Sequence, residues 1–420
     1  MNKSDDNKTC FDDYDPNSLL VEQALQRIDN QIQAIQEFET LRIRDALGRV
    51  LAHDVESQIN VPPHTNSAMD GYAVRGDDIC TDSTVTLEVV GKVLAGAPIQ
   101  TSVKPGQCVR IMTGGKMPDG TDTVIMQEHV NAQDSYITLS AGHTPGQNVR
   151  QAGEDIAIGQ VILNKGKLLG AADIGLLASL GIAEVDVIRR LRVAFFSTGD
   201  ELCPVGETLG DGQIYDSNRY TLFSLLTQFG AEIFDMGVIR DEPETIEAAF
   251  VEASTNADVL ITTGGVSVGE ADYVKTTLDR LGKVNFWKIA MKPGRPLAFG
   301  QVNHCQFFGL PGNPVSAMVT FYQFVLPALR KLSGQQLFEP LVVKLPCQSP
   351  LKKAPGRVEF QRGIIGKQAD GTLTVRSTGQ QGSGILSSMS QANCFIILPL
   401  ECSQTQPGDI VDVQPFYGLF

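Results

Sequence analysis

Five short polar segments in the second half of the chain contain the residue types most able to bind a charged ligand. Each follows a run of apolar, β-branched or aromatic residues, and each combines glycine or proline with acidic, basic or amide side chains. The segments are residues 198–201, 240–243, 264–272, 292–295 and 311–314. Hard divalent cations prefer carboxylate oxygens, whereas lysine and arginine attract phosphate groups. The segments together predict a site for an anionic, phosphate-bearing ligand and a divalent metal.

The acidic side chains of these segments are the predicted metal ligands. They are Glu201, Asp241 and Asp272. Two of them also fit a purely structural role, because Asp241 before Glu242 and Pro243 is typical of a helix N-cap and Asp272 would complement a helix dipole. Their recurrence at successive strand ends favours a shared site over these separate explanations.

Positive charge at the same place would come from Lys288, Lys292 and Arg295. The two lysines are four residues apart in an expected extended segment, which predicts that they share one face while Trp287 lies on the other. A lysine whose stem covers a buried strand is the structural alternative for Lys288.

The central glycine segment reads VLITTGGVSVGEADYV, from residue 259 to residue 274. Apolar residues lead into Gly264 and Gly265, and Ser267 and Gly269 follow before an amphipathic run, which predicts a strand, a tight turn and a helix. Such a turn brings backbone amides close to an anion. The segment has neither GxGxxG nor GxxxxGK[ST] spacing, so by itself it fits an ordinary turn between a strand and a helix equally well.

Strand and helix patterns alternate regularly from residue 191 to about residue 338. The expected strands are residues 192–197, 231–239, 259–262, 285–291 and 305–310, and the expected helices are residues 217–229, 244–255 and 315–331. This alternation predicts a doubly wound, mainly parallel sheet. The carboxyl ends of its strands should share one edge, so the five polar segments should meet in one crevice.

The rest of the chain divides into segments of different texture, which predicts a multidomain α/β protein. Residues 1–17 are polar and are expected to be disordered. Residues 18–56 and 147–190 are expected to form an elongated α/β domain, which begins with an amphipathic helix. The apolar stripe of this helix faces either its own domain, which is the commoner arrangement, or a second subunit. Residues 57–146 predict an inserted β domain, and residues 339–420 predict a small C-terminal β domain.

The composition argues against several classes of protein. The chain has 420 residues, a net charge of −14 and no block of Lys and Arg with interleaved aromatic residues, so no nucleic-acid-binding surface is expected. It contains no apolar stretch of about 18 residues and no leader-like N-terminal segment, which predicts no membrane association and a cytoplasmic location. Its eight cysteines and five histidines lack the spacing of a zinc site.

The motifs TTGGVSVGEADY, KPGRP and GLPGNPVSA resemble those of the molybdopterin molybdenumtransferase family, the bacterial MoeA type that is related to the E domain of gephyrin. Further similar motifs follow the family's order; they include NSAMDGYAVR, RIMTGGKMPDGTD, RQAGEDI, FFSTGDEL, GQIYDSNR, PGRVEFQRG and GQQGSG. The resemblance implies an elongated homodimer with four domains per subunit. It also implies Mg²⁺-dependent insertion of molybdate into adenylylated molybdopterin with release of AMP, and it allows docking onto other enzymes of the molybdenum-cofactor pathway.

The pattern and the resemblance together assign the site residues. The catalytic assignments are Asp70, Thr113, Asp155, Glu201, Asp241, Asp272, Lys288 and Lys292. The substrate-binding assignments are Gly264, Gly265, Ser267, Gly269, Arg295, Pro311, Gly312, Asn313, Pro314, Arg362 and Ser383. From the residues alone, Asp70 and Thr113 fit ordinary β-turns. The resemblance instead implies that they complete a crevice contributed by a partner subunit.

Three alternative functions stay open at this point. A molybdopterin adenylyltransferase shares the α/β domain, but its glycine loop usually continues as GGTG and it is a single domain. A non-catalytic dimeric scaffold that binds a peptide is the second alternative, although the retained acids and lysines favour catalysis. A nicotinamide-dependent oxidoreductase is disfavoured because the chain lacks the GxGxxG spacing.

Overall fold

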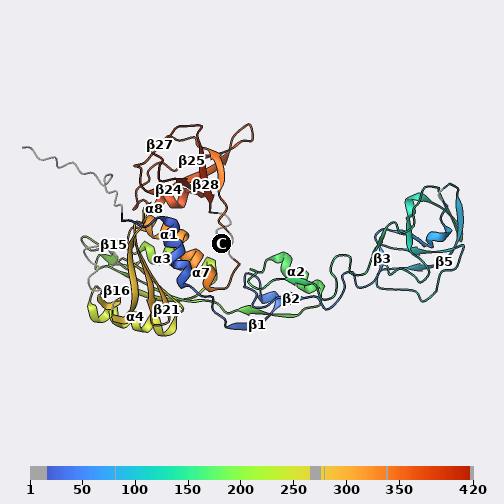
Figure 1. The fold of residues 1–420 in the computed structure, drawn as a ribbon, viewed down its shortest axis with the longest axis horizontal. Coiled ribbons are helices and arrows are strands. Elements are labelled where there is room, and N and C mark those ends of the chain that lie inside the picture. The colour runs from blue at the N-terminus through green and yellow to red at the C-terminus, as the bar shows by residue number, and fades with distance from the viewer. Residues whose placement is uncertain (1–16, 81, 265–275, 279, 337–338, 417–420) are drawn as a thin grey trace, which may run out of the picture. The chain divides into compact units, whose positions relative to one another are not determined.

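A computed structural model describes residues 17–80, 82–264, 276–278, 280–336 and 339–416. The chain forms two compact units, whose elements are labelled in Figure 1. The first unit contains residues 1–39, 48–50 and 187–420, and the second contains residues 40–47 and 51–186. Among the described residues, no helix is long and apolar enough to cross a membrane.

The first unit is built on a six-stranded sheet. Its strands, in spatial order, are β16 (Glu232–Ile239), β13 (Arg192–Thr198), β17 (Val259–Thr263), β21 (Cys305–Leu310), β20 (Pro296–Val302) and β18 (Gly282–Lys288). The first four strands are parallel, and β20 is antiparallel to both of its neighbours. The prediction of a mainly parallel sheet within a multidomain α/β protein is therefore confirmed.

Strand β20 is absent from the predicted elements. Proline at its start and Gly300 in its interior lower its apparent strand propensity, which explains why the pattern did not show it. A two-residue turn joins it to β21, with Asn303 at a φ of 54°. Because β20 reverses direction, the carboxyl end of β18 still lies at the same edge as those of the parallel strands.

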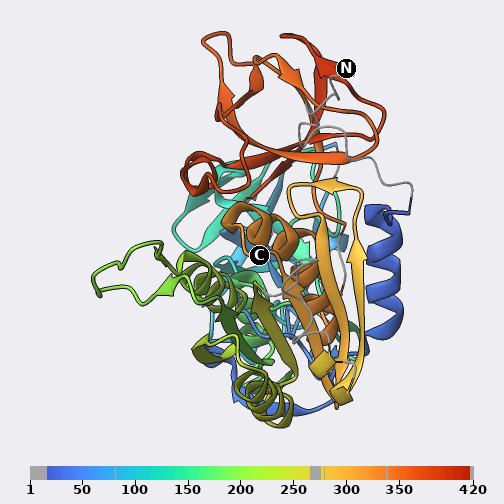
Figure 2. The same cartoon turned by 90° about the vertical axis from the view of Figure 1, so that its left-hand side faces the viewer.

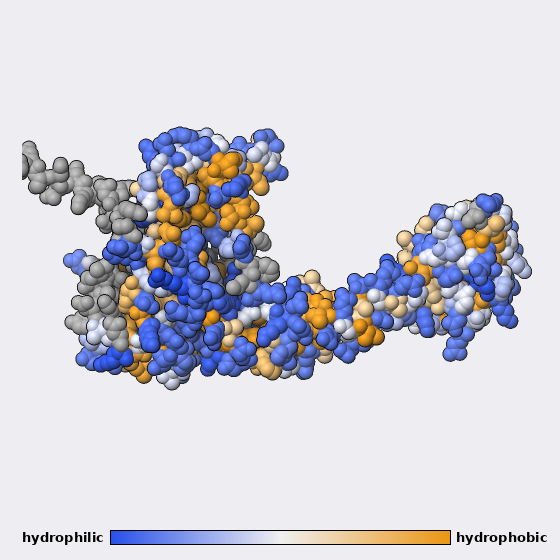
Figure 3. Space-filling model, in the orientation of Figure 1, coloured by the Kyte–Doolittle hydropathy of each residue, from blue (hydrophilic) through white to orange (hydrophobic). Residues whose placement is uncertain are grey.

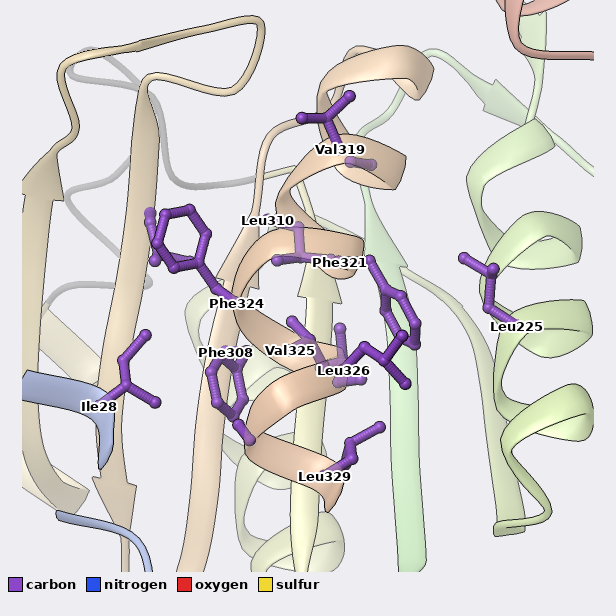
Figure 4. Close-up of a cluster of buried hydrophobic side chains, with 14 of the residues drawn as sticks. Ile28, Leu225, Phe308, Leu310, Val319, Phe321, Phe324, Val325, Leu326 and Leu329 are labelled. Carbon is purple, nitrogen blue, oxygen red and sulfur yellow. The ribbon is translucent and has the colours of Figure 1, made fainter. Parts of the chain in front are cut away.

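Successive residues of the central strands enter two different hydrophobic cores. Val193 and Phe195 pack on one face of the sheet, whereas Ala194 and Phe196 pack on the other. This alternation is what two-sided burial of a parallel strand requires. Figure 4 shows part of the first core, in which Phe308 lies among side chains of the long C-terminal helical segment of this domain.

Helices cover both faces of this sheet. The first core receives α3 (Ser217–Phe229) and a continuous helical segment made of α6 (Pro314–Thr320), the π-helix η4 (Phe321–Val325) and α7 (Leu326–Leu332). The second core receives α4 (Pro243–Asn256). The predicted stop of α3 is confirmed, because Gly230 adopts a φ of 85° and its amide donates to the carbonyls of Leu226 and Thr227.

Helix α1 (Val21–Gln31) packs in the same core as α3 and α7. Its buried residues Val21, Ala24 and Ile28 face inward, and the side of α1 seen in Figure 3 is hydrophilic. Leu19 forms a bridge with Ile289, and Figure 2 shows α1 beside the antiparallel edge of the sheet. The structure thus places α1 with the α/β domain, whereas the sequence analysis grouped it with residues 147–190; the remaining domain limits stay predictions.

A second sheet in the first unit forms the C-terminal domain. Its strands, in order, are β19 (Met291–Lys292), β24 (Val358–Lys367), β26 (Cys394–Leu398), β28 (Ile410–Pro415) and β22 (Val343–Pro346), while β25 (Leu373–Ser377) also pairs with β24. The pair β23 (Leu351–Lys352) and β27 (Gln404–Thr405) and the short helix α8 (Leu386–Gln391) complete it.

The position of β19 corrects one detail of the sequence analysis. Strand β18 ends at Lys288, and three residues later the chain joins the C-terminal sheet at Met291. Lys288 and Lys292 therefore belong to two different sheets and do not share a strand face. A strand can leave one sheet for another within a few residues without any change in its apolar pattern, so the sequence could not show the break.

The second unit contains a six-stranded sheet of short strands. Their order is β7 (Thr123–Met126), β4 (Gly71–Val74), β6 (Gln107–Ile111), β5 (Val85–Val93), β9 (Tyr136–Leu139) and β8 (Val130–Gln133). Outside this sheet lie the strand pairs β3 (Asn66–Ser67) with β10 (Val149–Arg150) and β2 (Val55–Glu56) with β11 (Val161–Leu163), and helix α2 (Ala171–Ser179). Strand β1 (Phe38–Arg42) pairs with β12 (Glu184–Ile188).

Candidate active site

A cavity of about 1350 Å³ lies in the first unit at the carboxyl edge of the parallel strands. One wall, called the sheet-edge wall below, consists of residues at or just after the carboxyl ends of β13, β16, β17 and β21 and of the start of α3. The opposing groups come from residues 291–296 and from the C-terminal domain at residues 350–352, 357–361 and 377–384. All five predicted polar segments therefore contribute described residues to one cavity.

Glycine allows two turns of the sheet-edge wall to pack closely. Gly264 has a φ of 88°, and a Cβ atom there would lie 2.6 Å from the carbonyl oxygen of Thr198. Any other residue would be strained and would clash with β13. The loop at Gly312 lies against Gly264, since a Cβ at Gly312 would be 3.8 Å from its Cα. Of the predicted glycine segment, only Gly264 is placed; Gly265, Ser267 and Gly269 lie outside the described residues.

The loop after β21 forms the start of α6. Pro311, Gly312, Asn313 and Pro314 all line the cavity, with Asn313 at the N-cap position and Pro314 at the first helical position. Pro at this position leaves no amide unsatisfied and has the backbone angle that a helix needs. The structure therefore brings all four predicted residues of this loop to the cavity.

Two of the three predicted metal ligands lie in this cavity. Glu201 and Asp241 are exposed residues of its lining, whereas Asp272 lies outside the described residues. A further carboxylate, Asp216, lines the cavity and is only 3% exposed. Its Oδ1 accepts a hydrogen bond of 3.1 Å from the amide of Arg219, and its buried Oδ2 has no hydrogen-bond partner among the described residues.

The donor chemistry of this wall fits Mg²⁺. Glu201, Asp241 and Asp216 offer carboxylate oxygens, the donors that a hard dication prefers together with retained waters. The described residues alone do not gather three acidic, histidine or cysteine side chains closely enough to hold an ion. The sequence analysis missed Asp216 because an Asp before Ser and Asn at the start of a helix reads as an N-cap, a role that its Oδ1 does perform.

The opposing wall, called the C-terminal wall below, carries positive charge and one buried carboxylate. Lys292 and Glu359 are in register on β19 and β24, and the Lys292 Nζ lies 3.3 Å from Oε1 of Glu359. The other oxygen of Glu359 accepts a hydrogen bond of 2.9 Å from the side-chain amide of Gln361. Arg295 also lines the cavity, whereas Lys288 is exposed and is not part of the lining.

Ser383 belongs to the loop between β25 and α8, and this loop contacts the start of α6. Its backbone carbonyl accepts a hydrogen bond of 3.0 Å from the amide of Val315, and the residue lines the cavity. Gln381 supports this loop: its Nε2 donates to the carbonyl of Arg362 at 3.0 Å, and its Oε1 accepts from the amide of Arg362 at 2.7 Å. Gln381 lies within the motif GQQGSG, but the sequence analysis assigned a role only to Ser383 of that motif.

Arg362 lies on the other side of β24 from this cavity. It is 1% exposed, and its guanidinium donates to the hydroxyl of Ser388 and to the carbonyl of Gly382, each at 3.0 Å. Burial lowers the pKa of its guanidinium to about 10. The structure therefore shows Arg362 holding the loop that contains Ser383, and its predicted contact with substrate stays a prediction.

The remaining predicted residues belong to the second unit. The amide and hydroxyl of Thr113 both donate to Oδ1 of Asp70, at 2.7 and 2.8 Å. These two hydrogen bonds lower the pKa of the Asp70 carboxyl. Asp155 is exposed in the turn that follows β10. The structure thus brings Asp70 and Thr113 together. The predicted contribution of these two residues to a partner subunit's crevice and the catalytic assignment of Asp155 stay predictions.

Comparisons with known proteins agree with this organisation. Three family models match consecutive parts of the chain: the MoeA N-terminal region (domain I and II) matches residues 19–181, the probable molybdopterin binding domain matches residues 194–331, and the MoeA C-terminal region (domain IV) matches residues 344–416. The fold and the cavity therefore define a multidomain protein built around a domain of the probable molybdopterin-binding type.

Individual relatives match almost the entire chain. A molybdopterin molybdenumtransferase of Haemophilus influenzae is 47% identical over 403 residues, which cover 96% of this chain and 99% of that protein. The gephyrin of Dictyostelium discoideum is 34% identical over 94% of this chain and 62% of its own length. The crystal structure of a MoeA protein from Pyrococcus horikoshii superposes with a TM-score of 0.83 at 30% identity, over 95% of this chain and 100% of that one. The chain belongs to the molybdopterin molybdenumtransferase family.

Proposed function

We propose that this protein inserts molybdate into adenylylated molybdopterin with release of AMP, and that Mg²⁺ supports the reaction. The observation that carries the proposal is the arrangement of charge in the cavity of about 1350 Å³. Its sheet-edge wall contains Glu201, Asp216 and Asp241, and its C-terminal wall contains Lys292 and further cations. A phosphate-bearing ligand, a tetrahedral oxyanion and a divalent metal that bind together need both the acidic wall and the basic wall.

The residues on the sheet-edge wall would hold the metal and the phosphate groups. Glu201 and Asp241 would be metal ligands, and Mg²⁺ bound there would supply positive charge that neutralises the phosphates. Backbone at Gly264 and Gly312 can approach a phosphate closely because neither residue has a side chain. The buried Oδ2 of Asp216 is a further acceptor for the metal or for one of its waters.

The experiment is an AMP-release assay with the purified protein, adenylylated molybdopterin, molybdate and MgCl₂. We expect AMP release that requires molybdate and Mg²⁺ and that stops when Mg²⁺ is removed with a chelator. Glu201→Gln should abolish release, and Glu252→Gln on the exposed face of α4 serves as the matched control. AMP release that is equal without molybdate, or equal in Glu201→Gln, would reject the proposal.

The remaining parts of the proposal concern assembly and setting. We propose a homodimer, in which Asp70 and Thr113 of one subunit complete the site of the other. The two hydrogen bonds that Thr113 donates to Asp70 support a preformed group of this kind. Docking onto other enzymes of the cofactor pathway and a cytoplasmic location are further predictions. Sedimentation at micromolar concentration tests the dimer, and a monomer there would contradict it.

A further inference from the structure

The C-terminal wall contains a row of polar residues that alternates along β24. Arg357, which directly precedes the strand, and Glu359 and Gln361 within it all line the cavity. Val358 and Phe360, which alternate with them, pack in the hydrophobic core instead. Alternate residues of a strand point to opposite faces, so this row faces the ligand space as a unit.

Charge on this row is only partly compensated. Glu359 is 4% exposed and pairs with Lys292, which cancels the charge of that lysine as seen by a ligand. Arg357 is partly exposed, and its side chain forms no ion pair or hydrogen bond with any residue that the structure describes. Lys352, also in the cavity lining, is likewise without such a partner within the described ranges. Arg357 and Lys352 therefore carry positive charge that no carboxylate of the described residues compensates.

The backbone around Arg357 is fixed on both sides. The amide of Gly356 donates to the carbonyl of Leu400, and the amide of Val358 donates to the carbonyl of Ala290, each at 2.9 Å. Gly356 has a φ of 94°, a conformation that favours glycine. Fixed backbone reduces the entropy lost when the side chain binds a ligand, and the planar guanidinium can donate two parallel hydrogen bonds to one oxyanion.

We propose that Arg357 is a further binding residue of this cavity and takes an oxyanion, either a tetrahedral metal oxyanion or a phosphate group of a nucleotide. Lys352 adds long-range attraction, while Lys292 and Glu359 form the neutral pair beside it. This inference rests on the proposed function only for the identity of the ligand, because the arrangement of charge is a property of the wall itself.

The test measures binding of three probes by isothermal titration calorimetry at one ionic strength: molybdate, inorganic phosphate and AMP. Arg357→Gln removes the charge, whereas Arg357→Lys keeps the charge but loses the planar guanidinium. Arg376→Gln, at an exposed position of β25 outside the cavity, is the matched control. Loss of a charged hydrogen bond should weaken binding at least about tenfold in Arg357→Gln. Arg357→Lys should lose less, and Arg376→Gln should bind like the parent protein.

The pattern across probes identifies the ligand. Weakening of molybdate binding alone assigns the metal oxyanion to Arg357, and weakening of phosphate and AMP binding alone assigns a phosphate group. Binding of all three probes by Arg357→Gln as tightly as by Arg376→Gln, with thermal unfolding unchanged, would overturn the inference. Failure of the parent protein to release AMP would reject the proposed function, whereas the binding comparison would still stand.

Discussion

The side-chain amide of Asn218 donates a hydrogen bond of 2.7 Å to the backbone carbonyl of Gly312. This contact joins the second residue of α3 to the loop between β21 and α6. Both residues line the cavity, so one neutral hydrogen bond connects two parts of the sheet-edge wall that are 94 residues apart in sequence.

Asn218→Ala should therefore loosen the loop at Gly312 and lower turnover. Loss of one neutral hydrogen bond costs about 1 kcal/mol of unfolding free energy. We expect a larger effect on AMP release than on stability, because the loop positions backbone at the proposed phosphate site. Asn256→Ala is the control, since Asn256 is exposed at the end of α4 and its side-chain amide donates only to the carbonyl of Glu252 in the same helix. Equal AMP release by the two variants would contradict this role for Asn218.

The pair of Lys292 and Glu359 predicts non-additive effects on stability. Lys292→Ala leaves the carboxylate of Glu359, whose side chain is 6% exposed, without its ammonium partner. Removing one partner of a buried ion pair lowers the free energy of unfolding by about 3 kcal/mol at the lower end of the usual range. We expect a loss at this lower end, because the Lys292 side chain is 37% exposed.

The double variant Lys292→Ala, Glu359→Gln should recover most of that loss, because no buried charge remains. Urea unfolding of the parent, both single variants and the double variant gives the coupling energy. Additive losses would show that the pair contributes nothing beyond its separate side chains.

Acid should weaken the first unit through Asp258. Burial by itself raises the pKa of this carboxyl, but hydrogen bonds from Arg189 at 2.7 and 2.9 Å and from the amide of Arg192 at 2.8 Å lower it overall. A carboxyl whose pKa is lower in the folded state stabilises the fold above its unfolded pKa and loses that contribution as the pH falls through its folded pKa.

Asp258→Asn should cost about 1.5 to 3 kcal/mol at pH 7. The difference from the parent should shrink as the pH falls below about 4, where the parent also loses the contribution. Urea unfolding between pH 3 and pH 7 measures this, with Asp211→Asn in an exposed loop as the control. A difference that stays constant over this range would contradict the assignment.

Cysteine reactivity should separate two kinds of thiol. Burial raises the pKa of Cys305 and of Cys394 to about 12, so both should resist a thiol reagent at pH 8 until the protein unfolds. Hydrogen bonds from Ser83 and Asp82 lower the pKa of Cys80, which is partly exposed. In a Cys10→Ser background, Cys80→Ser should remove the fastest phase of labelling by an aromatic disulfide. If that phase persists, it belongs to another cysteine and the prediction is wrong.

The α/β sheet could be predicted because the parallel strands β13, β17 and β21 are buried on both faces and each is followed by an abrupt polar turn. Gly199, Gly264 and Pro311 come directly after such strands, so their shared edge follows from chain direction alone. The antiparallel strand β20 could not be predicted, since its proline and Gly300 imitate a loop. Helix α1 shows a related limit: its apolar stripe predicts burial but does not reveal which domain covers it.

The C-terminal wall was harder to predict, because its motifs PGRVEFQRG and GQQGSG do not show which of their residues face the cavity. Arg357, Glu359 and Gln361 share a strand face with each other but not with Arg362, and this division depends on which residues of β24 enter the core. A charged residue such as Arg362 attracts attention in a sequence, yet its burial and its bonds to Ser388 and Gly382 are properties of the folded loop.

Because of strand β19, no single cut in the gene separates the two domains of the first unit. Met291 and Lys292 are encoded within the α/β domain, but they occupy the edge of the sheet that residues 343–415 form. A gene fragment that ends before residue 339 would encode Lys292 without the strand that holds it, and a fragment that starts there would lack its own edge strand. Exchange of either domain between relatives would therefore succeed only if the sequence from Ile289 to Arg295 moved together with the C-terminal domain.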